Sequence, residues 1–148
     1  MADVRPAHRI WLQNGTTPIF GGGVRELLLR TEATGSLHRA AAEMDMAYSK
    51  AWTIVRRAET HLGVSLLARR VGGPGGGGST LSEPGRRIVD AFGALANEVE
   101  AHVSVLFARH FGDLVGDRTH DPAPAGDALP RRSSSRTGHP TEPDSGMA

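Results

Sequence analysis

Cysteine is absent from the 148 residues of this chain, which excludes disulfide bonds, thiolate metal sites and cysteine nucleophiles within it. Aromatic residues make up only 5% and hydrophobic residues 39%, less than in an average globular protein. No run approaches the ~20 apolar residues of a membrane-spanning helix, and the first residues lack the apolar stretch of a signal peptide. We therefore expect a soluble, cytoplasmic protein with no membrane contact.

Large apolar residues become rare after about Asp113. The sequence beyond consists mostly of Pro, Gly, Ser, Asp and Arg, which offer little apolar surface to bury. We expect residues 112–148 to form a disordered polar tail and residues 1–111 to form one folded domain.

Lysine is scarce too, since Lys50 is the only one and every other basic residue is an arginine. The formal net charge of +1 says little by itself, but the charge is unevenly distributed. Between Ser36 and Arg87, eight basic residues minus four acidic ones give +4, whereas from Gly116 onward four arginines minus five acidic residues give −1. A basic segment of this kind is typical of a nucleic-acid contact surface.

This basic segment has the pattern of two helices joined by a tight break. An alanine-rich helix is expected over Leu37–Met44, with Ser36 as its N-cap, and a longer helix over Tyr48–Leu62, ended by Gly63. The break between them is centred on Asp45. Small residues on both helices permit close packing at a steep angle. The pattern predicts a helix-turn-helix whose second helix can enter a DNA major groove.

The longer helix separates an apolar face from a polar one. Its apolar residues, Ala51, Val55, Ala58 and Leu62, are four, three and four positions apart and are expected to face the core. We expect Trp52 to pack in the core or between helices. The predicted DNA-binding residues on the outer face are Tyr48, Ser49, Lys50, Thr53, Arg56 and Arg57. The two arginines are better placed for phosphates than for bases, and a merely solvated face is the simpler alternative.

Two strand-like runs, Ser65–Val71 and Ser79–Leu81, flank the glycine tract Gly72–Gly78 and predict a hairpin that forms a wing. A phosphate-binding P-loop would need a lysine that the tract lacks. Bare backbone at the tip could instead approach a DNA phosphate closely. The wing residues predicted to contact DNA are Arg69, Arg70, Gly75 and Gly76.

A short hairpin is predicted at the N-terminal side, with Arg9–Gln13 and Pro18–Phe20 as strands around the Asn14-Gly15 turn. Gly21–Gly23 is expected to lead out of it into a helix over Val24–Ala33. The fold class predicted from all these elements is mostly α with small β elements.

A last helix is predicted over about residues 83–111, with Ser82 as N-cap and Pro84 in its first turn. Its apolar stripe is too long to be covered by a core of this size, so we predict a homodimer. The residues predicted at the dimer interface are Ile88, Phe92, Leu95, Val99 and Leu106.

The residue pattern indicates binding and no catalytic reaction. The seven histidines are scattered, and no Ser/His/Asp group or carboxylate pair falls into a catalytic arrangement. We therefore expect no enzyme activity, no metal site and no cofactor. A small-molecule effector cannot be named from the residues.

Three features together resemble the DNA-binding domain of ModE-type molybdenum-responsive regulators and, more distantly, LysR-type winged helices. They are Tyr48 with Lys50-Ala51-Trp52, the glycine wing Gly72–Gly78, and Leu81 followed by Gly85-Arg86. The resemblance covers roughly Arg9–Phe107. It implies a bacterial transcription regulator that binds operator DNA as a dimer.

The chain also departs from that family. The polar tail is far too short for the family's molybdate-binding modules, so molybdate sensing is not carried over. The turn has Asp45 where the family has glycine, and Ala47 where it has a capping serine. An alternative reading follows, in which the domain keeps the fold, no longer reads an operator and binds a protein partner.

Overall fold

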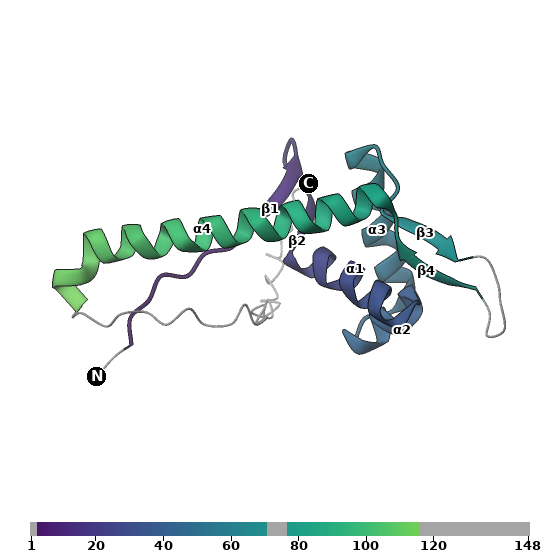
Figure 1. Cartoon of the computed structure of the whole chain (residues 1–148), viewed down its shortest axis with the longest axis horizontal. Coiled ribbons are helices and arrows are strands. Elements are labelled where there is room, and N and C mark those ends of the chain that lie inside the picture. Colours follow the sequence, from purple (N-terminus) through teal and green to yellow (C-terminus); the bar gives the residue numbers. More distant parts are fainter. Residues whose placement is uncertain (1–2, 71–76, 116–148) are drawn as a thin grey trace, which may run out of the picture. The chain divides into compact units, whose positions relative to one another are not determined.

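The computed structural model describes residues 3–70 and 77–115, which all lie within one compact unit. They form a winged helix-turn-helix, mostly helical with two small hairpins, as predicted (Figure 1). The elements in chain order are β1 (Trp11–Asn14), β2 (Thr17–Gly21), α1 (Gly22–Thr34), α2 (Leu37–Glu43), α3 (Tyr48–Leu62), β3 (Leu67–Arg70), β4 (Gly78–Leu81) and α4 (Glu83–Val115).

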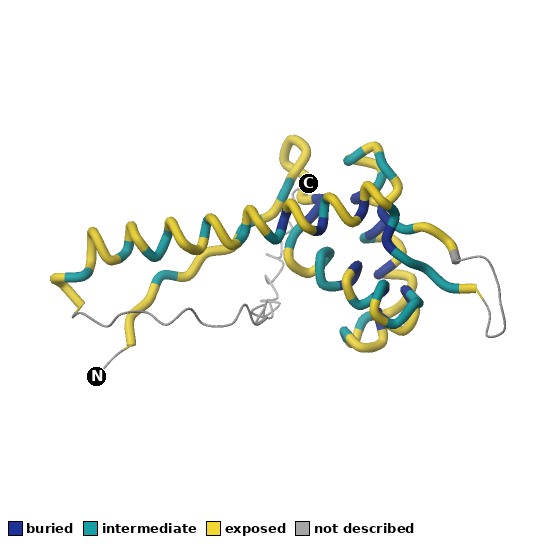
Figure 2. Tube along the Cα trace, in the orientation of Figure 1, coloured by how far each residue is buried: buried dark blue, intermediate teal, exposed yellow. Residues whose placement is uncertain are grey.

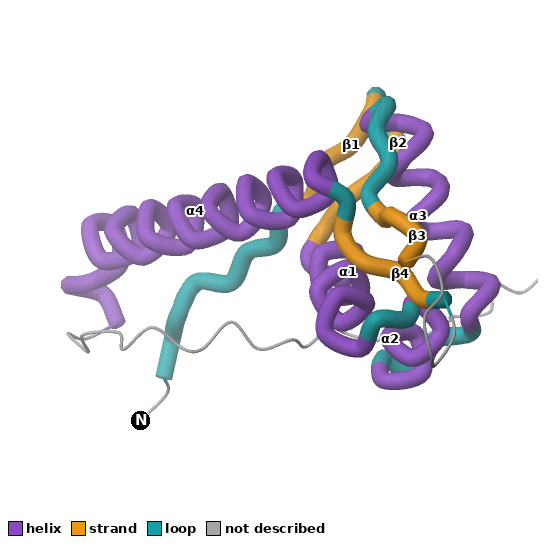
Figure 3. The backbone as a smooth tube through the Cα atoms, turned by 45° about the vertical axis from the view of Figure 1, so that its right-hand side comes forward, coloured by secondary structure: helices purple, strands orange, loops and turns teal. Residues whose placement is uncertain are grey.

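Each hairpin is an antiparallel pair of consecutive strands. In β1 and β2, Leu12 lies opposite Phe20, and the register shifts between Leu12 and Gln13. In β3 and β4, which form the wing, the register is regular from Leu67 opposite Leu81 to Arg70 opposite Gly78 (Figure 3). The predicted N-terminal hairpin and the base of the predicted wing are therefore confirmed.

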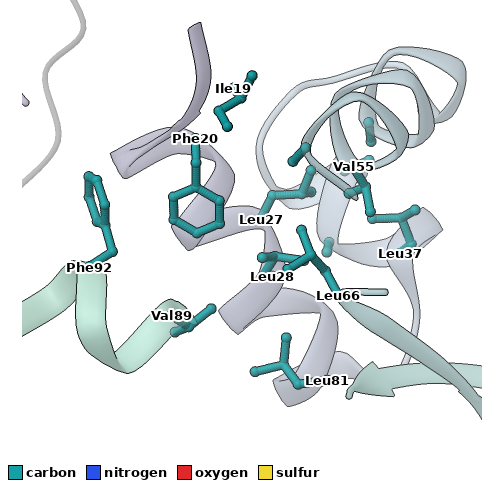
Figure 4. Packing of buried hydrophobic residues seen from close by; sticks show 14 residues of the cluster. Ile19, Phe20, Leu27, Leu28, Leu37, Val55, Leu66, Leu81, Val89 and Phe92 are labelled. Carbon is teal, nitrogen blue, oxygen red and sulfur yellow. The ribbon is translucent and has the colours of Figure 1, made fainter. Parts of the chain in front are cut away.

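The core lies where α1, α2 and α3 meet the first turns of α4 (Figures 2 and 4). Leu27 and Leu28 of α1 are fully buried at its centre. The Phe20 ring faces Phe92 of α4, with their centroids 5.3 Å apart. The other buried apolar residues are Ile19, Leu37, Ala40, Ala41, Ala51, Val55, Ala58, Leu66, Leu81 and Val89. Alanines at the α2–α3 contact let these two helices approach closely, as their pattern predicted.

The turn between α2 and α3 has the features expected of its two unusual residues. Asp45 has φ 52°, the left-handed region that glycine adopts more readily. The Met46 N–H donates to the Ala41 carbonyl at 2.9 Å and closes the turn. Ala47 occupies the N-cap of α3 with no side-chain hydrogen bond, so Asp45 does not replace the missing cap.

Two helix boundaries differ from prediction by more than one residue. α1 begins at Gly22 rather than Val24, because Gly21 serves as its N-cap and Gly22 and Gly23 accept helical geometry in the first turn. α4 continues to Val115, beyond the predicted end near residue 111. The disordered tail was predicted to begin at residue 112, but residues 112–115 belong to α4; the rest of the tail, from 116 onward, lies outside the described residues. The predicted caps Ser36, Gly63 and Ser82 are confirmed.

The start of α4 is packed directly on the backbone that precedes the wing. The Gly85 N–H donates to Ser82 Oγ at 2.9 Å, and the Ser82 N–H donates to the Leu66 carbonyl at 3.0 Å. A β-carbon on Gly85 would lie 2.2 Å from that carbonyl oxygen. Only glycine therefore permits this approach.

Gly85→Ala should lower the free energy of unfolding by about 1–3 kcal/mol, because backbone must move to admit the methyl group. Gly112→Ala in the same helix is the matched control, since nothing lies within 4 Å of its β-carbon position. The control should be neutral or stabilising by up to about 1 kcal/mol. Urea unfolding followed by circular dichroism measures both, and equal effects of the two substitutions would contradict the close packing at Gly85.

Ala47→Ser should raise the free energy of unfolding by about 0.5–2 kcal/mol, because a serine hydroxyl can accept from an unpaired N–H in the first turn of α3. Ala42→Ser, at an exposed position in α2, offers no cap and serves as control. Thermal unfolding of the three proteins measures the difference. A melting temperature of Ala47→Ser at or below that of the control would show that α3 does not need a cap.

Candidate nucleic-acid interface

The outer face of α3 is exposed along its whole first part. The predicted contact residues Tyr48, Ser49, Lys50, Thr53, Arg56 and Arg57 are all exposed, whereas Ala51, Val55 and Ala58 on the opposite face are buried. The division of the helix into two faces is thus confirmed. That the outer face contacts DNA stays a prediction.

The hydroxyl groups in the first half of α3 differ in whether their hydrogen is free to bond to a ligand. Thr53 Oγ1 donates to the Ser49 carbonyl at 2.8 Å, so its hydrogen is already used within the helix. The Tyr48 ring packs against His38 of α2, with centroids 5.5 Å apart.

Among the described residues, Lys50 and Arg57 have no acidic partner within salt-bridge distance, so both cations are available to an external anion.

The expectation that Trp52 packs in the core is wrong. Its side chain is 48% exposed, because it lies one position, or about 100°, from the buried stripe of α3. The Arg56 guanidinium lies over the indole ring, 5.2 Å from its centroid. The spacing of four residues between Trp52 and Arg56 is the signal that could have indicated this pair.

Glu59 was missed altogether by sequence reasoning. One of its carboxylate oxygens accepts from Arg56 Nη1 at 3.2 Å, and the other accepts from the Leu66 N–H at 2.9 Å. The carboxylate therefore links α3 to the segment that enters β3. A single acidic residue three positions after Arg56 carried no pattern that would have marked this second role.

A groove of about 260 Å³ lies between α3 and the base of the wing. Its charged and polar lining includes Tyr48, Arg56, Glu59, Arg69 and Ser79, and Trp52 forms part of its wall. The groove is bordered by both the helix and the wing.

The wing residues are only partly described. Arg69 is exposed on β3, as a contact residue must be. The side chain of Arg70, and Gly75 and Gly76 at the expected tip, lie outside the described residues. The proposed role of these three stays a prediction.

Two other arginines, Arg86 and Arg30, form ion pairs within the protein and are therefore poorer candidates for contact with an external anion. The hydrogen bond that Arg86 donates to Glu32 of α1, together with the charge of Glu32, raises the pKa of Arg86 above its ordinary value. A hydrogen bond to Glu26 does the same for the pKa of Arg30, aided by Glu43. The Arg86–Glu32 and Arg30–Glu43 pairs join different helices, and the Arg30–Glu26 pair lies within α1, so neither arginine is a free cation for a ligand.

The predicted dimer residues on α4 fall into two groups. Phe92 is buried in the core of its own protomer, and Ile88 packs against that core. Both are therefore used within one chain, and this part of the prediction needs correction. Leu95 and Leu106 are 44% and 45% exposed, and Val99 is half-buried on the same face.

The N-terminal arm, residues 3–10, runs beside α4 (Figures 1 and 3). His8 Nδ1 lies 3.3 Å from Glu100 Oε2. Within the described ranges there is no group of three or more His, Cys, Asp or Glu residues arranged for a metal ion. No helix in this part of the chain is both long and apolar enough to cross a membrane.

Known proteins share this domain. Residues 26–86 match the family described as bacterial regulatory helix-turn-helix protein, lysR family. The molybdenum-pterin-binding protein MopB of Rhodobacter capsulatus is 32% identical over 110 residues, which are 74% of this chain and 38% of that protein. The molybdenum transport protein ModE of Azotobacter vinelandii is 35% identical over 83 residues, 56% of this chain and 31% of that protein.

The transcriptional regulator ModE of Yersinia pestis is 33% identical over 70 residues, 47% of this chain and 27% of that protein. The chain thus spans about a third of the length of the curated relatives it matches. Residues 26–86 are thus similar to the helix-turn-helix domain of LysR-type regulators, and a longer stretch of the chain is similar to part of the ModE-type relatives.

Proposed function

We propose that this chain is a transcriptional regulator that binds double-stranded DNA as a homodimer. The observation that carries the proposal is the exposed polar face of α3, set opposite its buried stripe within a segment that matches a DNA-binding family. Lys50 and Arg57 on this face supply cations, and Tyr48 and Ser49 supply hydrogen-bonding groups near the helix start.

The proposed complex places the N-terminal half of α3 in a major groove and the wing beside it. Side chains at the start of a recognition helix reach base edges, whereas arginines further along reach phosphates. Lys50 is therefore assigned to bases, and Arg57 and Arg69 to the backbone. Affinity should fall steeply with salt, because each neutralised phosphate releases counterions.

The proposed dimer uses the part of α4 beyond Phe92. Leu95, Val99 and Leu106 continue the face that packs on the core at Ile88 and Phe92, but here no part of the described chain covers it fully. Further along, Leu114 is 76% exposed. A second copy of the helix is the simplest cover for a stripe of this length, and it would set the spacing of two DNA half-sites.

Lys50→Ala should weaken binding to the preferred duplex about tenfold, because a base contact is lost in the major groove. Arg5→Ala, on the exposed N-terminal arm, removes the same charge away from α3 and serves as control. Fluorescence anisotropy with DNA from upstream of the gene measures both. Equal affinities of the two variants would remove Lys50 from the contact surface, and no binding by the wild type at low salt would favour the protein-interaction alternative.

Leu106→Glu should convert the dimer to monomer, because it buries a charge in the apolar α4 interface. Ala101→Glu, on the opposite side of the same helix, should remain dimeric. Size-exclusion chromatography with light scattering gives both masses. A wild-type mass of one chain, or a dimeric Leu106→Glu, would contradict the proposed interface.

A further inference from the structure

We propose that Glu59 takes the place of a DNA phosphate in the free protein. It holds Arg56 there, and on binding Arg56 exchanges the Glu59 carboxylate for a phosphate of the DNA backbone. This inference rests on the proposed DNA-binding function. In this proposal Glu59 positions Arg56, and Trp52 belongs to the part of α3 that contacts DNA.

The two oxygens of Glu59 have separate tasks. Oε1 accepts from the backbone N–H groups of Leu66 at 2.9 Å and Leu67 at 3.4 Å, and from Ser65 Oγ at 3.4 Å. Oε2 faces outward to Arg56 Nη1 at 3.2 Å. The Glu59 side chain is only 11% exposed, so its position is determined by Oε1 and does not depend on Arg56.

Arg56 is held much less firmly than its partner. Its side chain is 61% exposed, and one Nη1–Oε2 contact joins it to Glu59. The pair is open to solvent on its Arg56 side, and solvent-exposed ion pairs stabilise a protein by at most about 1 kcal/mol, so a DNA phosphate can replace the carboxylate at small cost. The indole of Trp52, with Arg56 stacked over it, keeps the guanidinium beside the groove during the exchange.

The groove explains why an exchange is needed. Arg56 and Arg69 both line it, and a phosphodiester there would meet two cations. Glu59 lines the same groove and repels a phosphate as long as its charge is unscreened. Arg56 has N–H groups to spare, but Glu59 neutralises its charge, so it offers the phosphate a full positive charge only after turning away from Oε2. The carboxylate therefore weakens binding to any DNA while it keeps Arg56 placed at the groove.

The test compares the salt dependence of binding to an unrelated duplex, which requires no knowledge of the operator. Fluorescence anisotropy at several salt concentrations is measured for the wild type, Arg56→Ala, Glu59→Gln and Glu43→Gln. Glutamine at position 59 keeps an oxygen for the Leu66 N–H and places an amide N–H₂ group toward Arg56. Glu43→Gln is the matched control, since Glu43 is an exposed carboxylate that pairs with Arg30.

If Arg56 exchanges partners, Arg56→Ala should make the slope of log K against log salt shallower by about 0.9, the contribution of one phosphate. Glu59→Gln should tighten binding roughly two- to fivefold, as expected for a released ion pair. Glu43→Gln should have a smaller effect. If Glu59 only held the segment that enters β3, Glu59→Gln would bind DNA no more tightly than the wild type.

An unchanged slope in Arg56→Ala would show that Arg56 stays with Glu59 when DNA binds. If Glu59→Gln increased the DNA affinity no more than Glu43→Gln does, the increase would reflect only the loss of one negative charge. Either result overturns the exchange and leaves the DNA-binding proposal intact. Absence of wild-type binding at low salt would overturn both proposals. Should Glu59→Gln fail to fold, the slope of Arg56→Ala still decides, because Arg56 makes no core contact.

Discussion

Three functional elements meet at the backbone of one residue, Leu66. Its side chain is fully buried in the core, its N–H donates to Glu59 of α3, and its carbonyl accepts from Ser82 at the start of α4. Gly85 then packs against the same carbonyl. Because β3 begins at the next residue, the recognition helix, the wing and the last helix are positioned by one short segment. The relative placement of the surfaces proposed to bind DNA and the partner depends on this contact.

The same junction connects folding to binding. Glu59 stabilises the entry to the wing through one oxygen and holds Arg56 through the other, so the fold and the electrostatics of the groove share a side chain. A carboxylate in a groove proposed to bind DNA is unfavourable for affinity, but here its backbone hydrogen bonds give a structural reason for its presence. In the proposed complex such a group would limit attraction to DNA in general and leave discrimination to residues such as Lys50.

Much of this architecture could be predicted from residue patterns. The caps Ser36, Gly63 and Ser82 and the two faces of α3 follow from local rules, and they are confirmed. Contacts between distant segments left no such pattern. The burial of Phe92 against Phe20 depends on where α4 crosses the N-terminal hairpin, which apolar periodicity does not encode. The exposure of Trp52, by contrast, follows from its position beside the predicted stripe of α3; the expectation of burial gave its size more weight than that position.

The central claim is that the outer face of α3 and the wing bind specific DNA. The most direct measurement is fluorescence anisotropy of the purified wild-type chain on DNA from upstream of its gene and on a scrambled duplex of equal length, across a salt series. The account predicts a preference of ~10³ or more for the upstream DNA, with affinity for both falling steeply as salt rises. Absence of binding to either duplex at low salt would contradict it.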